Sequence, residues 1–206
     1  MLFGRQLFLS ITVFVITTRL SCVSSRIKLR GSGLQPRRYK VPTYFNPRGS
    51  CDGNAAPTHK RLARLWSKLR FHLAVLSNGT LQGVNDTYCQ LTNRCLFELQ
   101  SCGTSLIRIK HIESGLYVAI NKAGKVYTTR KSHKLDTMFV QELLPNDFFV
   151  FWSERTYRKT KRLMYLALKK NGATKNALKT SSKHKSVHFM VMHCSRHRNQ
   201  RATPNC

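Results

Sequence analysis

Three stretches of the chain repeat one pattern of apolar and polar positions. Each has a short apolar run, a polar turn that ends in glycine, and a return segment: residues 73–81 (LAVLSNGTL), 117–126 (YVAINKAGKV) and 165–174 (YLALKKNGAT). Glycine adopts the positive φ that tight hairpins require, and Asn-Gly, present at 78–79 and 171–172, is a strong hairpin signal. The pattern therefore predicts three β-hairpins.

The spacing of these hairpins predicts the fold class. Gly79, Gly124 and Gly172 lie 45 and 48 residues apart, an interval typical of folds assembled from copies of one unit. An apolar run precedes each hairpin (66–71, 106–112, 148–152) and another follows it (96–99, 138–143, 187–192). Each unit then has about four strands, roughly twelve in all. Three four-stranded units about a pseudo-threefold axis describe an all-β fold, the β-trefoil; a β-propeller competes less well, because propellers begin at about four blades.

Composition divides the chain into four parts. Residues 1–24 have the basic start, the apolar run and the small residues of a secretory signal peptide, and the run is shorter than the roughly 20 apolar residues of a membrane span. A retained signal anchor is the alternative. Residues 25–62 hold four prolines and four glycines and form a basic, flexible leader. The repeats occupy 63–194, and 195–206 is a basic tail. We expect a secreted, extracellular protein without membrane insertion.

Two sequence features fit export. Asn78 and Asn85 each begin an Asn-X-Thr sequon, and Asn78 is the better candidate for glycosylation because it lies on a hairpin tip. Removing Cys22 with the signal leaves six cysteines, which suggests disulfides although 15 pairings are open. Among local bridges we favour Cys89–Cys102, which would close the end of the first repeat.

The charge of the chain predicts its partner. The formal net charge is +28, and residues 155–206 hold fourteen Lys and Arg with no acidic side chain. Repulsion on this scale opposes folding, so a polyanionic partner is expected. Nucleic acid and sulfated polysaccharide both fit, since either releases counterions on binding. Export favours the polysaccharide, and no helix-turn-helix, zinc-finger or RNA-reading pattern is present.

The charge is densest after the third hairpin. Six lysines fall within 17 residues around a loop rich in small polar residues, where they could converge on one face. Dispersed, solvated lysines are the alternative. The six, called the lysine strip below, are Lys169, Lys170, Lys175, Lys179, Lys183 and Lys185.

Three segments carry a family resemblance: residues 115–126 (GLYVAINKAGKV), 164–172 (MYLALKKNG) and 187–190 (VHFM). With them the chain resembles the fibroblast growth factors over about 63–192. The resemblance implies a β-trefoil signalling ligand that binds receptor tyrosine kinase ectodomains with heparan sulfate as co-receptor. The heparin-binding positions of the family fall on the lysine strip. Its apolar receptor contacts fall on Trp66, Trp152, Met190 and Met192, for which core packing is the alternative role.

The chain also departs from the family pattern. The glycine-rich turn of the heparin loop reads Ala177-Leu-Lys-Thr-Ser-Ser182, without glycine. A common acidic receptor contact appears as Pro145, and the following segment reads Asp147-Phe-Phe149. The core cysteine of the family falls on Met138. Receptor preference therefore does not carry over through this region.

Other functions fit the sequence less well. Only eight carboxylates exist, no pair suggests acid–base catalysis, and no hydrolase or phosphate-loop motif appears, so we expect no enzyme, no cofactor and no metal. The Gln-x-Trp signature of ricin-like trefoils is missing, and interleukin-1-type trefoils seldom carry so basic a strip. A secreted glycosaminoglycan-binding or antimicrobial protein without receptor activity remains the main alternative.

Overall fold

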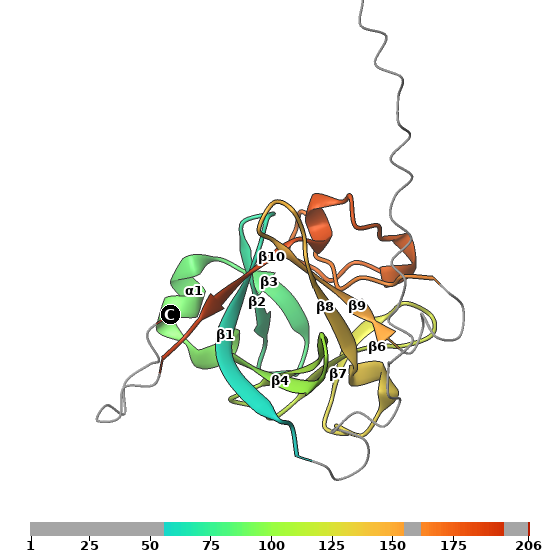
Figure 1. Cartoon of the computed structure of the whole chain (residues 1–206). Helices are drawn as coiled ribbons and strands as arrows, with labels where there is room; N and C mark the ends of the chain where they lie inside the picture. The colour runs from blue at the N-terminus through green and yellow to red at the C-terminus, as the bar shows by residue number, and fades with distance from the viewer. Residues whose placement is uncertain (1–55, 155–161, 196–205) are drawn as a thin grey trace, which may run out of the picture. The chain divides into compact units, whose positions relative to one another are not determined.

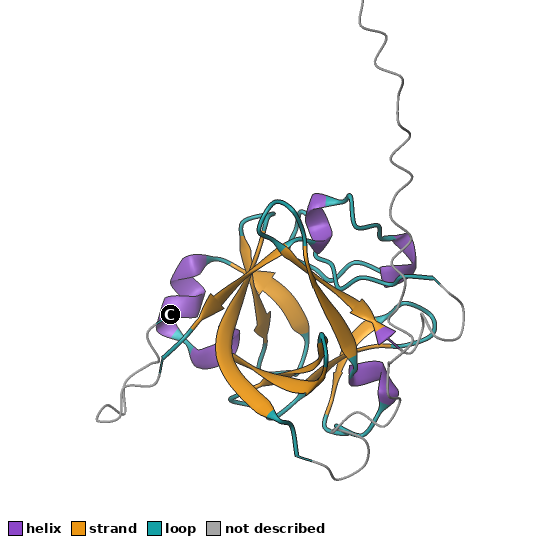
Figure 2. Cartoon of the chain, viewed as in Figure 1, coloured by secondary structure: helices purple, strands orange, loops and turns teal. Residues whose placement is uncertain are grey.

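The computed structural model describes residues 56–154, 162–195 and 206, and this part consists mainly of β-strands joined by turns and short helical segments (Figures 1 and 2). The ten strands there are β1 (His59–Ser67), β2 (Phe71–Val75), β3 (Leu81–Val84), β4 (Phe97–Gly103), β5 (Leu106–His111), β6 (Tyr117–Ile120), β7 (Val126–Thr129), β8 (Phe139–Leu143), β9 (Phe149–Ser153) and β10 (Phe189–His193). The helical segments are α1 (Asp86–Leu91), η1 (Asn93–Cys95), η2 (Leu135–Thr137), η3 (Ala177–Lys179) and η4 (Lys185–Val187).

Six of these strands close into an antiparallel ring. β1 pairs with β4, β4 with β5, β5 with β8, β8 with β9, β9 with β10, and β10 with β1. Closure leaves no free sheet edge in this ring, which is how barrels avoid edge-to-edge association. The ring forms the barrel visible in Figure 1.

Three hairpins join this barrel, one from each repeat. β2 pairs with β3, and β6 pairs with β7, as the glycine turns predict. In the third repeat the hairpin is reduced to the bridge Leu168↔Thr174, and the bridge Trp152↔Tyr165 joins it to β9, so the described residues form ten strands where about twelve were expected. The β-trefoil prediction is confirmed.

Each hairpin tip bonds to the next repeat, and the last returns to the first. Thr128 Oγ1 donates to the Gly79 carbonyl at 2.6 Å, Ala177 N to that of Gly124 at 2.8 Å, and Gly83 N to that of Gly172 at 2.7 Å. Gly124 and Gly172 have φ of 74° and 80°, and a side chain at either would collide with the partner segment. The repeated glycines therefore serve both the turn and the contact between repeats.

The hydrophobic core draws on all three repeats. Strand alternation directs Ala63, Leu65 and Ser67 of β1 inward, while Arg64 and Trp66 lie on the outer face. The same alternation fills the barrel from the other strands. Every repeat contributes large side chains with no exposed surface, among them Leu65 and Phe97, Ile109 and Phe139, and Phe151 and Phe189.

The structure moves one predicted boundary. β1 begins at His59, within the segment assigned to the leader, because residues 59–62 pair with β4 from His59↔Ser101 to Leu62↔Glu98. The side chains of His59, Lys60 and Arg61 are exposed, so backbone pairing with a distant strand orders them. Local hydrophobicity could not predict that pairing. The predicted signal peptide and most of the leader lie outside the described residues.

The disulfide prediction was right in kind and wrong in pairing. Cys89 is bonded to Cys95, and Cys194 is bonded to Cys206. Cys89 at α1 and Cys95 at η1 have Cα atoms 5.5 Å apart and pack against Ala74. Cys102 is also disulfide-bonded, but it is buried in a different cluster from Cys89. The helical segments that bring Cys89 and Cys95 together were not apparent from spacing.

Candidate functional site

The lysine strip lies on the last part of the third repeat. Five of its six lysines are exposed, and Lys175 is partly buried. Lys169 N donates to the Ala173 carbonyl at 2.7 Å, and Lys175 N to that of Ala167 at 2.9 Å, which fixes the strip onto the third hairpin. The strip is thus held at several backbone positions while its ammonium groups remain in water.

The loop within the strip folds without the glycines of the family pattern. Asn176 caps η3, because its Oδ1 accepts from Leu178 N at 2.8 Å. Thr180 Oγ1 donates to the Ala177 carbonyl at 2.6 Å and accepts from Tyr165 N at 3.0 Å. Ala177 itself is fully buried. Polar side chains therefore define the turn for which glycine is the usual residue.

The structure adds three cations to this face that were not apparent from the sequence. The tip of the β6–β7 hairpin, residues 121–125, meets the strip where Asn176 Nδ2 donates to the Ala123 carbonyl at 3.1 Å. Lys122 and Lys125 on this tip are exposed. Arg162 Nη2 donates to the Leu178 carbonyl at 2.6 Å. Lys122 and Lys125 lie more than forty residues before the strip in sequence, so local charge density could not join them to it, whereas Arg162 lies only seven residues before Lys169.

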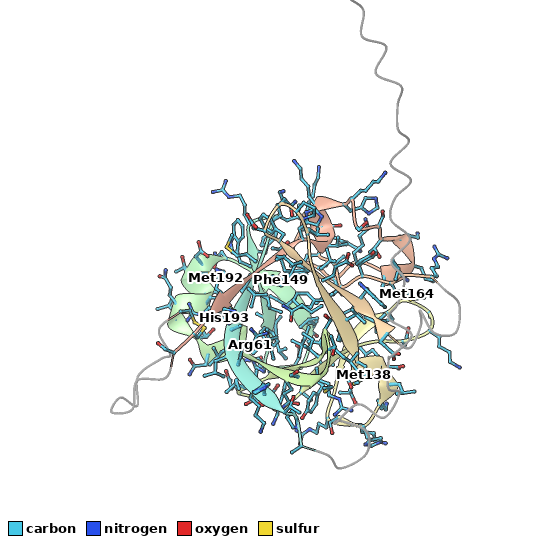
Figure 3. All side chains as sticks on the ribbon, viewed as in Figure 1. Arg61, Met138, Phe149, Met164, Met192 and His193 are labelled. Atoms are coloured by element: carbon cyan, nitrogen blue, oxygen red, sulfur yellow. A yellow bond between two sulfur atoms is a disulfide. The ribbon has the colours of Figure 1, made fainter. Side chains whose placement is uncertain are left out.

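Three of the four predicted apolar receptor contacts lie together on the outer face where β1 meets β10. Trp66 is paired directly with Met190, and Arg64 with Met192. Met190 is 42% exposed, and Trp66 and Met192 are partly buried. Figure 3 shows Met192 on β10 beside β1. Residues two apart on a strand share a face, so this group forms one surface.

Trp152 does not belong to that surface. It is 2% exposed and lies in a core cluster with Cys102, Met138 and Tyr165. Its partner on β8, Val140, belongs to the same cluster, which is separate from the barrel core that holds the neighbouring Phe151. The assignment of Trp152 as a receptor contact is therefore wrong, and the core role that was the alternative is correct.

Phe148, unlike Trp152, lies close to the surface formed by Trp66, Met190 and Met192. It is partly buried and immediately precedes Phe149, which pairs with Phe189 beside Met190. Lys68 Nζ lies 4.7 Å from the centroid of the Phe148 ring. We call Phe148, Trp66, Met190 and Met192 the apolar patch. The sequence showed two aromatic residues in the segment Asp147-Phe-Phe149, but only the strand pairing shows which of them belongs to β9.

Both sequon asparagines are exposed. Asn78 lies on the β2–β3 turn, where its Oδ1 accepts from Thr80 N at 2.9 Å. Asn85 is the N-cap of α1, with Oδ1 accepting from Tyr88 N at 3.0 Å. In both residues the side-chain oxygen makes the local bond, so the amide nitrogen that a glycan would modify is not used in it. Glycosylation at either position stays a prediction.

A buried histidine lies beside the apolar patch. His72 on β2 is paired with Trp66, and its Nε2 is 2.5 Å from Oδ1 of Asp86 at the start of α1. Burial lowers the pKa of His72, and the Asp86 carboxylate opposes this shift. The neutral imidazole is therefore favoured, and it ties α1 to the sheet under the patch.

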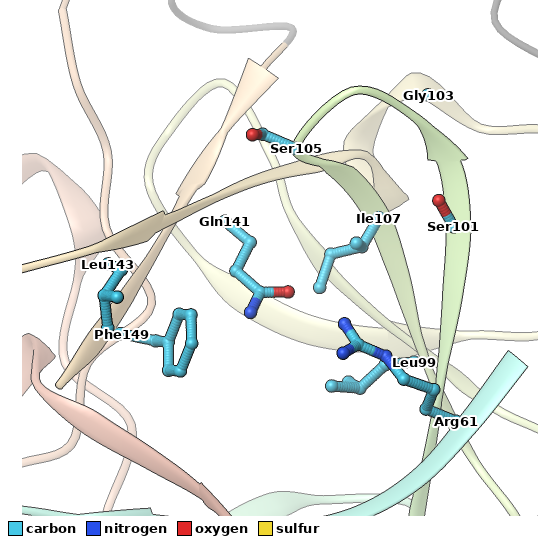
Figure 4. A pocket seen from close by; sticks show the side chains of 9 residues that line it. All are labelled: Arg61, Leu99, Ser101, Gly103, Ser105, Ile107, Gln141, Leu143 and Phe149. Atoms are coloured by element: carbon cyan, nitrogen blue, oxygen red, sulfur yellow. The ribbon is translucent and has the colours of Figure 1, made fainter. Parts of the chain in front are cut away.

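A pocket of about 310 Å³ opens at one end of the barrel, lined by residues of β1, β4, β5, β8 and β9 and of the β4–β5 turn (Figure 4). The guanidinium of Arg61, the carboxamide of Gln141 and the ring of Phe149 point into it. None of its nine lining residues carries a carboxylate. It therefore holds no carboxylate pair of the kind that glycoside hydrolysis uses.

No group of three or more His, Cys, Asp or Glu residues that could hold a metal ion occurs in the described parts of the chain. Within those same residues, no helix has the length and apolar character to span a bilayer.

Comparison with known proteins gives the family. The sequence model of the family "Fibroblast growth factor" matches residues 61–190. The chain is 34% identical to fibroblast growth factor 4 of Gallus gallus over 142 residues, which are 68% of either chain. It is 27% identical to fibroblast growth factor 10 of Mus musculus over 132 residues, 64% of this chain and 61% of that protein. Fibroblast growth factor 7 of Homo sapiens is 26% identical over 132 residues, 64% of this chain and 66% of that protein.

The described chain is thus a β-trefoil that carries a lysine-rich segment and an apolar patch. The chain belongs to the fibroblast growth factor family. Members of this family are growth-factor signalling ligands and not enzymes, and secretion and heparin binding are typical of them. The family resemblance read from the three segments is confirmed.

Proposed function

We propose that the protein is a secreted ligand that binds a receptor tyrosine kinase ectodomain with heparan sulfate as co-receptor and promotes receptor dimerisation and signalling. The observation that carries this proposal is the presence of two chemically different surfaces on one trefoil. The lysine strip suits a sulfated polysaccharide, and the apolar patch suits a protein. Neither surface contains groups arranged for chemistry on a substrate.

The lysine strip suits sulfate because its cations are many, exposed and without competing carboxylates in the sequence around them. No acidic residue occurs in residues 155–206. Lys122, Lys125 and Arg162 widen the face beyond the strip, so a chain of several sugars could be bound at once. Binding of this kind releases counterions and weakens steeply with salt.

The apolar patch suits a receptor because aromatic and methionine side chains in a rim of polar groups are the composition of protein interfaces. Trp66 and Met190 lie opposite each other on paired strands, which fixes their relative positions before binding. Preorganised aromatic side chains commonly supply about 2 kcal/mol or more each to an interface. The receptor is therefore expected to depend on few residues here.

The first experiment removes the polysaccharide site. Replacing Lys169, Lys170, Lys179 and Lys185 by Ala should lower the salt concentration at which the protein elutes from heparin. The slope of log affinity against log salt should fall by up to about 0.7–0.9 for each lysine–sulfate ion pair removed, by analogy with nucleic acid. A folded variant with an unchanged profile would exclude this site. The basic leader could also bind heparin, so it is tested separately. Deleting all of residues 25–62 would remove the start of β1 at His59, so only residues 25–55 are deleted.

The second experiment removes the receptor site. Phe148→Ala combined with Met190→Ala should abolish receptor phosphorylation while heparin elution stays close to that of the wild type. The matched control is Leu143→Ala, an exposed apolar residue at the end of β8 outside the patch. If the wild-type protein binds heparin and activates no growth-factor receptor, the plain glycosaminoglycan-binding function replaces the proposal.

A further inference from the structure

One buried histidine contacts both surfaces. His188 lies between η4 and β10, is 7% exposed, and reaches the lysine strip through its ring nitrogen and the apolar patch through its ring face. We propose that His188 is a positioning residue shared by the two sites: its N–H fixes the strip, and its ring supports Phe148. This inference rests on the proposed function of the two surfaces.

The contact with the strip is a hydrogen bond to the backbone. His188 Nε2 lies 2.7 Å from the Ser182 carbonyl oxygen. A carbonyl only accepts, so Nε2 must carry the hydrogen. Ser182 precedes Lys183 and lies three residues after Lys179, in a loop otherwise held by turns such as His184 N to the Ser181 carbonyl at 3.0 Å. The histidine bond joins this loop to the base of β10.

The contact with the patch is between rings. The centroids of the His188 and Phe148 rings are 6.0 Å apart, with an interplanar angle of 35°. Lys68 completes the group: its backbone N donates to the His188 carbonyl at 2.9 Å, and its Nζ lies over the Phe148 ring. His188 therefore holds Phe148 directly and also places the cation that packs on it.

The second ring nitrogen supports a specific role for histidine at this position. Nδ1 of His188 is buried, and no hydrogen-bond partner for it occurs among the described residues. An unsatisfied buried polar atom is unfavourable, and an apolar side chain would avoid it. An apolar side chain, however, could not donate the hydrogen bond that Nε2 makes to the Ser182 carbonyl. A ring with one N–H donor is the combination that both contacts require.

Two substitutions separate the two contacts. His188→Phe keeps a ring against Phe148 and removes the donor to Ser182, so heparin elution should move to lower salt while receptor affinity stays within about 2-fold of the wild type. His188→Gln keeps an amide donor and removes the ring, so heparin elution should hold while receptor affinity falls about 3- to 10-fold, the worth of one aromatic contact. Receptor binding is measured by surface plasmon resonance on immobilised ectodomain without heparan sulfate. The controls are His184→Phe and His184→Gln, at an exposed histidine of the same loop.

The opposite behaviour of the two variants is the decisive result. A merely structural histidine would give the same loss of both activities in both variants, and that result, or no change in either, overturns the shared role. Hydrogen exchange of the free protein separates this failure from failure of the proposed function. Exchange at residues 182–187 should quicken in His188→Phe and not in His188→Gln, whatever the protein binds. If that difference appears but the wild type binds no receptor, both the proposed function and the shared role of His188 are wrong. The hydrogen bond by which His188 positions the loop at Ser182 is then still supported.

Discussion

The lysine strip and the apolar patch are adjacent in the fold and differ in how they are built. The strip lies on turns and on two short 3-10 segments, η3 and η4, and its backbone is held in part by Asn176 and Thr180. Three of the four patch residues lie on the paired strands β1 and β10, and Phe148 lies immediately before β9. Charge in the strip is redundant and tolerant of exact position, whereas the patch depends on the register of a few residues.

The two surfaces therefore differ in what the sequence could predict about them. The convergence of the six lysines on one face stays a prediction, but six lysines within 17 residues are a local signal that can be read without knowing the strand pairing. The face to which an aromatic residue points does depend on it, since a shift of one residue reverses every side chain of a strand. Trp152 was assigned to the surface because the sequence does not show that Cys102, Met138 and Tyr165, from other elements, cover it.

The largest expected effect is a loss of stability, and it distinguishes Trp152 from the apolar patch. Trp152→Ala should lower the free energy of unfolding by about 3–5 kcal/mol, the usual cost of truncating a large buried aromatic residue. Trp66→Ala, on the outer face, should cost far less. Chemical denaturation monitored by circular dichroism measures both. Equal and small decreases would return Trp152 to the surface and contradict the buried position.

A smaller effect is expected where the strip meets the second hairpin. In Gly124→Ala the new methyl group would collide with Asn176 Oδ1, at a φ of 74° that itself costs about 1–2 kcal/mol for a residue other than glycine. We expect lower stability and earlier elution from heparin, although no charge is removed. Gly115→Ala is the control, because a methyl group there meets no atom within 4 Å although its φ is also positive, 67°. Equal heparin elution of the two variants would show that the hairpin does not position the strip.

The next effect tests the width of the lysine face. Lys122→Ala with Lys125→Ala should reduce the salt dependence of heparin binding by at most about 0.7–0.9 per lysine in log–log slope and leave the midpoint of unfolding almost unchanged. Lys60→Ala is a matched single control on an exposed strand position of β1. A slope that does not differ from the control would limit the site to the strip.

The smallest expected effect is on the dependence of stability on pH. Because burial lowers the pKa of His72, the unfolded chain binds a proton at higher pH than the folded protein does. Stability is therefore full above the ordinary histidine pKa of 6.5 and falls as pH decreases below that value toward the lowered pKa. Burial lowers the pKa of His111 as well, so both histidines contribute to the dependence of stability on pH. His72→Gln should flatten the decline measured by denaturation between pH 7 and about pH 5. A decline as steep as that of the wild type would assign the effect to other groups.

The repeats, the fold class, the family and the lysine strip could all be predicted from the order of the residues. Each of these depends on signals that are local or periodic: Asn-Gly turns, alternation, glycine spacing and the density of charge. The resemblance to the family also chose Trp66, Met190 and Met192, which share one surface because β1 and β10 pair in register.

Features that depend on distant partners needed the folded chain. Folding paired Cys89 with Cys95, buried Trp152, brought Lys122 and Lys125 to the strip, and started β1 at His59. In each case the deciding contact is made with a residue in another element, or through a helical segment that no repeat of the pattern contains. Pairing register and packing between repeats are properties of the closed barrel as a whole, and no single stretch of the chain carries them.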